Sequence, residues 1–166
     1  MFIPFDEMPG HSRIWIYQAD RALTQTEQET VSTSLHAFCS GWAAHGHQLL
    51  TSYCLAHRHF IILAADEAAA GASGCSIDSS VRHLKALGAQ LGVDFFNRTL
   101  IPFLFGDDVH LISISSLKEG FSSGKLGADT PTLNMLAGTV GEFASHWVIP
   151  AGQTWMSRYL PEAKTA

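Results

Sequence analysis

Cys75 and the polar side chains around it are the residues of this sequence best suited to chemistry. The segment 74–80 reads G-C-S-I-D-S-S and follows the apolar run F-I-I-L-A-A at 60–65. This order predicts a strand that leads to the start of a helix. Backbone N–H groups at a helix N-terminus lack helical partners and lie at the positive end of the dipole, so they favour anions and thiolates. We therefore expect a small anionic ligand at 74–80, bound by Gly74, Cys75, Ser76, Asp78 and Ser79.

Cys75 is also the candidate catalytic residue, because a thiol of lowered pKa is a nucleophile. A cysteine-dependent enzyme needs a base or supporting carboxylate as well, for which the sequence offers His45, His47, His57, His59, Asp66 and Asp78. The alternative interpretation is structural. In that case Cys75 packs the corner between strand and helix, and Ser76 or Asp78 caps the helix. Cys39 and Cys54 fall inside a predicted helix and a predicted strand, so we expect both to be structural.

Two His-x-His pairs, His45 with His47 and His57 with His59, have a spacing that suits metal ligation on a strand. However, the first pair straddles Gly46, and the second falls in a predicted hairpin turn. No further ligand motif completes either set. We expect these histidines to be solvated loop residues, with no metal site and no cofactor.

Asp66 and Glu67, together with Asp78, form a second candidate group near Cys75. Paired carboxylates perform acid and base catalysis only where their separation and burial split their pKa values. The alternative is that Asp66 and Glu67 end a strand in solvent while Asp78 caps the next helix.

Hydrophobic periodicity predicts the elements that position these residues. Strands are expected at 13–18, 49–56, 60–65, 98–105 and 109–115. A capping box of Thr24 and Glu27 begins the first helix, which we expect to end at Gly46. A second helix covers 77–91 and stops at Gly92. Because Pro102 cannot donate to a ladder, its strand is expected at a sheet edge.

This β-α-β-β-α-β order predicts an α+β fold. The expected form is a ferredoxin-like split βαβ sandwich, in which two helices cover one face of an antiparallel sheet. A Gly- and Ser-rich loop follows Leu117, and helical spacing returns over 133–147 before a short turn with Trp155 and Tyr159. We expect one domain over 1–166, with its core at about 10–117 and a C-terminal helical extension at about 128–166.

Composition limits the classes of partner. With 46% hydrophobic and 15% charged residues, the chain can bury a core without metals or disulfides. A net charge of -5 without a cluster of Lys or Arg argues against nucleic-acid binding. Neither a signal peptide nor an apolar run long enough to span a membrane is visible, and three widely spaced cysteines favour reduced thiols. These features predict a cytoplasmic protein.

Several segments resemble an uncharacterised family of small bacterial proteins. They are M-F-I-P-F-D-E-M-P at 1–9, W-I-Y-Q at 15–18, W-A-A-H-G at 42–46, F-I-I-L at 60–63 and S-G-C-S-I-D-S-S-V at 73–81. The resemblance covers most of the chain and implies a bacterial protein without an established activity.

Some members of that family are labelled transporter ATPases, a label that this sequence does not support. A P-loop needs G-x-x-x-x-G-K-[ST] to wrap phosphates and reach magnesium. Here Gly120 and Gly124 have one residue too few between them, and Leu126 occupies the place of the hydroxyl.

Three functions remain open from the sequence. We favour a small ligand-binding or protein-interaction domain. A ferredoxin-like sheet leaves one face uncovered, so the chain is expected to self-associate as a homo-oligomer such as a homodimer, or to bind the anionic ligand at 74–80. The second is the cysteine-dependent enzyme that uses Cys75. The third is a structural or regulatory subunit that docks through the C-terminal segment from Thr130 onward.

Overall fold

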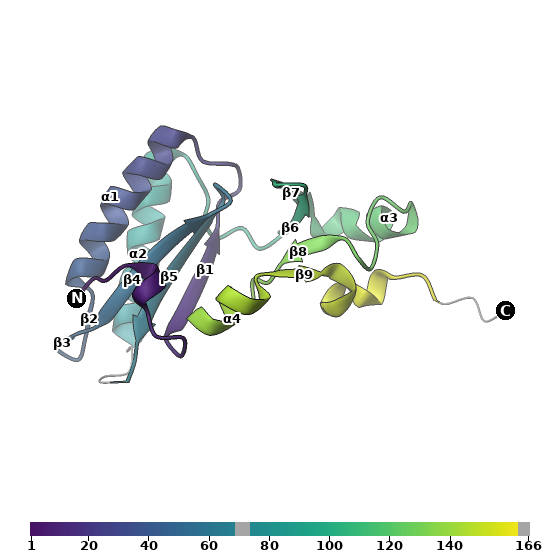
Figure 1. The fold of residues 1–166 in the computed structure, drawn as a ribbon. Coiled ribbons are helices and arrows are strands. Elements are labelled where there is room, and N and C mark those ends of the chain that lie inside the picture. Colours follow the sequence, from purple (N-terminus) through teal and green to yellow (C-terminus); the bar gives the residue numbers. More distant parts are fainter. Residues whose placement is uncertain (69–73, 163–166) are drawn as a thin grey trace. The chain divides into compact units, whose positions relative to one another are not determined.

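The computed structural model describes residues 1–68 and 74–162, apart from the side chain of Cys75 (Figure 1). Its helices and antiparallel sheets confirm the α+β class. The chain divides into two compact units, one of Met1–Asn97 with Leu136–Ser145 and one of Arg98–Met135 with the residues from His146 onward. This division falls inside the region predicted as the core, and the single-domain organisation stays a prediction. None of the described helices is long and apolar enough to cross a membrane.

The first unit contains a three-stranded sheet, a small hairpin and the two long helices. In chain order its elements are η1 (Phe5–Glu7), β1 (Arg13–Gln18), α1 (Gln25–Gly41), β2 (Ala43–Ala44), β3 (His47–Gln48), β4 (Leu50–Ala56), β5 (Phe60–Asp66), α2 (Gly74–Leu91) and most of α4 (Val140–His146).

β5 lies at the centre of this sheet and pairs antiparallel with both neighbours, in the order β1-β5-β4. Leu63 marks the register, since it lies opposite Trp15 on one side and Tyr53 on the other. The ferredoxin-like topology is not confirmed, because β6 joins a different sheet instead of pairing beside β1. Thr139 forms only an isolated bridge with Arg13 at that edge.

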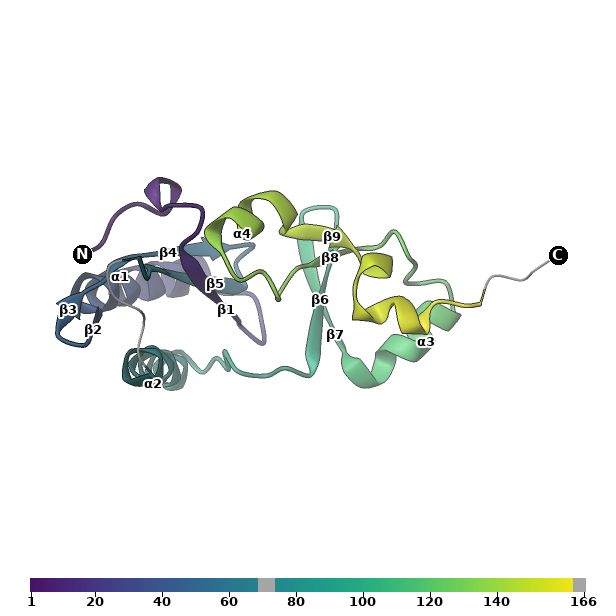
Figure 2. The same ribbon diagram turned by 90° about the horizontal axis from the view of Figure 1, so that it is seen from below.

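Both faces of the sheet are covered. α1 and α2 pack on one face, where Leu35, Leu84 and Leu63 belong to a single buried core. Figure 2 shows η1 and α4 on the side of the sheet opposite α2. The rings of Phe5 and Phe143 join η1 to α4, with centroids 5.8 Å apart.

α1 begins as predicted and ends earlier than predicted. The Thr24 side chain accepts from the Glu27 N–H while the Glu27 carboxylate accepts from the Thr24 N–H, which confirms the capping box. The helix ends at Gly41, and Gly46 (φ +76°) instead forms the turn between β2 and β3. Trp42 follows the helix in an extended conformation. Its side chain is only 3% exposed because the ring packs against Trp15 and Phe38, and this packing ends the helix.

The second unit has a four-stranded sheet in the order β7-β6-β8-β9. Its elements are β6 (Leu100–Phe105), β7 (Asp108–Ser113), η2 (Ile114–Ser116), α3 (Leu117–Ser122), β8 (Pro131–Leu133), β9 (Val148–Pro150), η3 (Ala151–Gln153) and η4 (Trp155–Tyr159). The predicted β6–β7 hairpin is confirmed, with Gly106 at a φ of +65° in its turn. A separate core joins Phe103 to Phe121 of α3 and Met156 of η4.

Two predictions in this unit are wrong. Pro102 lies in a central strand, since β6 pairs with both β7 and β8. The strand tolerates proline because its pairing with β8 is limited to Phe103 opposite Thr132, and the Thr132 hydroxyl donates to the Pro102 carbonyl. The helix expected over 133–147 is reduced to α4, because β8 already includes Leu133.

The end of α2 requires glycine at two positions. Gly92 adopts a φ of +66°, and the Val93 N–H donates to the Gly88 carbonyl at 2.9 Å, as in a Schellman motif. A Cβ on Gly88 would lie 2.4 Å from the Val93 carbonyl oxygen. The helix therefore closes tightly on the segment that follows it.

Gly88→Ala is expected to lower the free energy of unfolding by about 1–3 kcal/mol, since backbone must move to accept the methyl group. Gly41→Ala is the matched control, because a Cβ on Gly41 would have no neighbouring atom within 4 Å and alanine favours helix. Urea denaturation of both variants checks this. A Gly88→Ala protein as stable as Gly41→Ala would contradict the tight closure.

Candidate functional site

The predicted ligand-binding residues lie in the first turns of α2. Gly74 is the first helical residue and is exposed, as is Asp78, whereas Ser76 is buried and Ser79 is half-buried. The side chain of Cys75 lies outside the described residues, as do residues 69–73. Because α2 begins at Gly74, Ser76 and Asp78 lie inside the helix, and the prediction that one of them caps it is wrong.

The hydroxyl groups of this segment bond to the helix itself. Ser79 Oγ donates to the Ser76 carbonyl at 2.7 Å, and Ser80 Oγ donates to the Ile77 carbonyl at 2.6 Å. The indole Nε1 of Trp42 also donates to the Ser76 carbonyl, at 2.9 Å. These contacts fix the start of α2 against Trp42, which follows α1. They also occupy the Ser79 hydroxyl proton, so Ser79 is not positioned to donate to a ligand.

The carboxylates at the end of β5 pair with residues around the start of β1. Asp66 Oδ1 lies 3.1 Å from His11 Nε2 and accepts from the Ala68 N–H at 2.9 Å. Glu67 Oε1 lies 3.4 Å from Arg13 Nη1. The antiparallel pairing of β1 with β5 brings these groups together, and no local sequence signal linked them.

The two described thiols are poor nucleophiles. Cys39 is fully buried, and desolvation raises its pKa to about 12 despite the nearby Thr51 hydroxyl. Cys54 is half-buried on β4, and desolvation raises its pKa to about 11. The structural role predicted for both residues agrees with this burial, whereas the reactivity of Cys75 stays a prediction.

The two His-x-His pairs lie at hairpin turns, where His47 already belongs to β3. His45 (φ +52°) precedes Gly46 between β2 and β3, and His57 (φ +50°) begins the β4–β5 turn. His59 is different, because it is buried and its Nδ1 lies 2.9 Å from the His57 carbonyl oxygen. Among the described residues, no group of three or more His, Cys, Asp or Glu side chains could hold a metal ion.

The β4–β5 turn holds two non-glycine residues, His57 and Arg58, at positive φ. Such a turn normally takes Asn or Gly. Here the strain is offset by hydrogen bonds to the chain before α1. The Leu23 N–H donates to the Arg58 carbonyl at 2.8 Å, and the Ala19 N–H donates to the His59 carbonyl at 2.7 Å.

A contact that the sequence did not reveal joins α1 to α2. Ser34 Oγ lies 2.9 Å from His83 Nε2, and the His83 ring stacks on Phe38 with centroids 4.7 Å apart. Burial lowers the pKa of His83, so the imidazole is neutral at neutral pH, and its tautomer determines which of the two groups donates. The pair resembles a nucleophile and base, but Ser34 lies in the middle of α1, where backbone N–H groups are already bonded and offer no oxyanion site.

The glycine-rich segment after Leu117 does not have the form of a phosphate loop. Gly120 lies within α3, and a Cβ there would meet Leu126 Cδ1 at 2.8 Å. The Ser123 and Leu126 N–H groups donate to the carbonyls of Glu119 and Gly120. The segment is thus the C-terminal end of a short helix.

Exposed aromatic and basic groups gather on η4 in the second unit. Trp155 is 39% exposed, and the Arg158 guanidinium lies 5.1 Å from its ring centroid and 5.8 Å from that of Tyr159. Met156 is 2% exposed in the core, and Tyr159 stacks on Phe121. We call Trp155, Arg158 and Tyr159 the η4 cluster. The core holds it through Met156 and Tyr159, while Trp155 and Arg158 are exposed.

In comparisons with known proteins, no family model, no curated protein and no solved structure matches this chain. The resemblance to small bacterial proteins stays a prediction.

Cys39 and Cys54 are expected to react with iodoacetamide at about pH 8 more than about tenfold slower than in the urea-unfolded chain, because little thiolate forms at their raised pKa values. Mass spectrometry of labelled peptides measures each rate. Fast labelling of either thiol in the folded protein would contradict its burial. The rate of Cys75, measured in the same sample, tests the enzyme hypothesis.

His83 is expected to make stability depend on pH. Since its folded pKa is lowered, the unfolded chain binds the proton more readily, so the free energy of unfolding falls as pH drops below about 6.5 and is fully regained above it. Urea denaturation between about pH 5 and pH 8 should therefore show a smaller slope for His83→Gln than for the unchanged protein. An equal slope would show that His83 does not contribute.

Proposed function

We propose that this protein is an interaction domain that docks on a partner protein through the η4 cluster. The supporting observation is an exposed tryptophan held in place by an arginine and by a buried core beneath it. Trp, Tyr and Arg are the residue types that contribute most often to binding energy at protein interfaces. The cluster lies within the C-terminal segment that the sequence suggested as a docking element.

The cluster is already ordered before binding. The Thr154 side chain accepts from the Met156 N–H at the start of η4, and Met156 fixes the helix to the core of the second unit. Tyr159 stacks on Phe121 with an interplanar angle of 13°. Because these contacts restrict the rotamers of the exposed side chains, little conformational entropy is lost when a partner binds.

The charge of Arg158 defines the chemistry of the partner. In the part of the chain that the structure describes, no carboxylate lies within 4 Å of its guanidinium, and its Nε donates only to the Trp155 carbonyl, at 3.3 Å. The partner surface should therefore present an apolar side chain to Trp155 and a carboxylate to Arg158. A cytoplasmic location and self-association of the chain are parts of the same proposal.

Photo-crosslinking tests this proposal without removing the cluster. Benzoylphenylalanine at Ser157, an exposed residue of η4, should form a discrete adduct with one partner in the source cells, and the same group at Lys118 on α3 should not. Trp155→Ala in the Ser157 derivative should abolish that adduct, and Arg158→Glu should reduce it, because each change removes one of the binding groups.

With the captured partner purified, Trp155→Ala should raise the Kd at least about tenfold. Equal adducts from positions 157 and 118, or an adduct that survives Trp155→Ala, would reject docking at the η4 cluster.

A further inference from the structure

An open pocket lies at the C-terminal end of α2, within the first unit. It is formed by the last turns of α2, the segment that follows them and the chain between β1 and α1 (Figure 1), and its volume is about 470 Å³. Most of the lining is apolar, and it includes Leu84, Val93, Phe95 and Phe96. Small-molecule sites are typically pockets of about 300–1,000 Å³ with an apolar lining and a few polar groups. This pocket, the α2 pocket, has the size and lining of such a site.

Three charged residues complete the lining, Asp20, Lys85 and Asp94. Within the described ranges, no oppositely charged side chain lies within 4 Å of any of them. Each carboxylate uses one oxygen for the backbone. Asp20 Oδ1 accepts from the Asp94 N–H at 3.2 Å, and Asp94 Oδ1 accepts from the Phe96 N–H at 2.8 Å. Both aspartates are exposed, so the second oxygen of each is accessible to a ligand.

The surroundings of the two carboxylates favour a cation. The Asp20 N–H donates to the Asp94 carbonyl at 3.0 Å, so each aspartate is bonded to the backbone of the other. They lie beside the negative end of the α2 dipole, and the last turn of this helix contains no basic residue. Arg21 reaches the same end through the Leu91 carbonyl, but its guanidinium is paired with Glu27 at 2.8 Å. An ammonium group is therefore the complementary ligand here.

Lys85 supplies the opposite charge at the same pocket. Its Nζ lies 5.6 Å from the centroid of the Phe96 ring, within the range of a cation–π contact. The Phe96 ring in turn packs against Tyr17 of β1, with centroids 5.6 Å apart. The Lys85 ammonium is thus held over an aromatic ring without a carboxylate partner, and it can bind an anionic group of a ligand.

We propose that the α2 pocket binds a free α-amino acid with an apolar side chain. The ammonium group of the ligand lies at Asp20 and Asp94, its carboxylate at Lys85, and its side chain against the apolar lining. The combination of charges determines this class of ligand. A simple organic cation would be repelled by Lys85, and a simple anion by two carboxylates and the end of a helix. A neutral apolar molecule would desolvate all three charges without pairing them.

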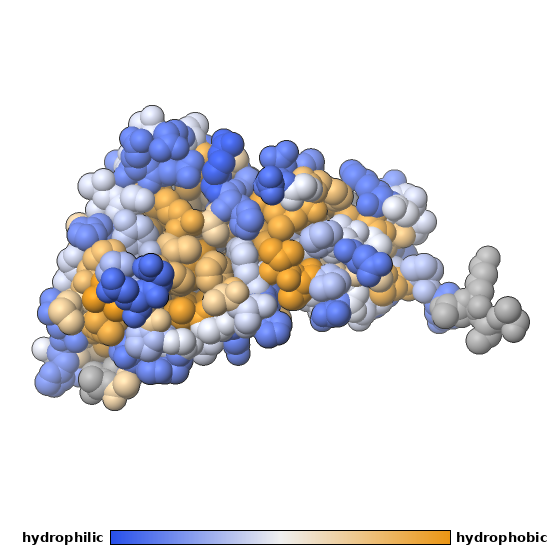
Figure 3. Space-filling view, in the orientation of Figure 1, coloured by the Kyte–Doolittle hydropathy of each residue, from blue (hydrophilic) through white to orange (hydrophobic). Residues whose placement is uncertain are grey.

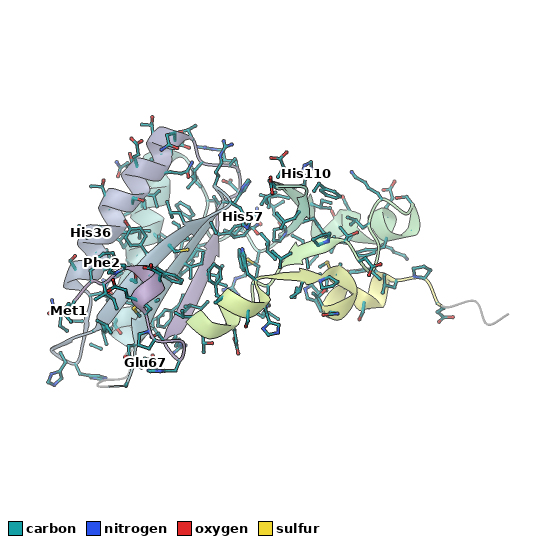
Figure 4. The ribbon with its side chains drawn as sticks, in the orientation of Figure 1. Met1, Phe2, His36, His57, Glu67 and His110 are labelled. Carbon is teal, nitrogen blue, oxygen red and sulfur yellow. The ribbon has the colours of Figure 1, made fainter. Side chains whose placement is uncertain are left out.

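The outer edge of β4 is also partly open, but it does not select a ligand by charge. There the Thr51 N–H donates to the Met1 carbonyl at 2.9 Å. Figure 4 shows Phe2 beside His36 of α1, and their ring centroids are 4.4 Å apart. Beyond Thr51, no backbone hydrogen bond from the described residues meets this side of the strand. β4 contains no charged residue, and Figure 3 shows apolar residues gathered over the strands of this sheet.

NMR titration of the isotope-labelled full chain with L-phenylalanine and with L-leucine tests the proposal. Saturable shifts are expected at the amides of Gly92, Asp94 and Phe96, which line the pocket. Phenethylamine and hydrocinnamate should each bind at least about tenfold more weakly than phenylalanine, because each lacks one of the two charged groups. The absence of shifts up to the solubility limit of both amino acids would overturn the proposal. So would saturable shifts confined to other residues, or equal affinity for phenylalanine and its two analogues.

Two variants test the charged groups one at a time. Asp94→Asn keeps an oxygen that can accept from the Phe96 N–H, and Lys85→Gln removes the ammonium. Each should raise the Kd for phenylalanine at least about tenfold. Asp107→Asn and Lys118→Gln remove the same charges at exposed positions outside the pocket and should leave the Kd unchanged.

An unchanged Kd in both pocket variants, or an equal rise in the two control variants, would overturn the assignment. Urea denaturation shows whether each variant is folded. Trp155→Ala should bind phenylalanine as the unchanged chain does, because Trp155 does not line the α2 pocket. Failure of docking at the η4 cluster is therefore distinguished from failure of binding at the α2 pocket.

Discussion

The burial of β5 is the constraint on which the first unit depends. Its residues from Phe60 to Ala65 are all fully buried, on both faces of the strand. A strand with apolar side chains on both faces is stable only if both faces are covered. The long helices cover one face, and η1 with α4 lies on the other (Figure 2). The chain must therefore return to this sheet at 136–145, between β8 and β9 of the second sheet.

Burial and pairing also make the described thiol, hydroxyl and carboxylate groups unreactive. The thiols of Cys39 and Cys54 lie where desolvation disfavours the charged form, and the Ser79 and Ser80 hydroxyls donate to the carbonyls of their own helix. The carboxylates at the end of β5 are paired with His11 and Arg13. What the described surface offers instead is the exposed η4 cluster of one unit and the partly open β4 edge of the other.

These two surfaces differ in their physical basis. The η4 cluster depends on side chains, whose aromatic and guanidinium groups are pre-ordered by Met156 and Phe121. The β4 edge depends on backbone groups, so its selectivity comes from strand direction and register rather than from residue identity.

Local interactions could be read from the sequence because neighbouring residues determine them. The capping box at Thr24, the β4–β5 and β6–β7 hairpins and the stop at Gly92 all depend on spacing within a few residues. Which strands share a sheet was decided by tertiary structure. The β6 hairpin found its partners in β8 and β9, and Trp42 left its helix to bury its ring and bond to Ser76. The pairing of Ser34 with His83 and the free half of β4 likewise arise only when distant segments meet, because packing and hydrogen bonding between them are not encoded in local periodicity.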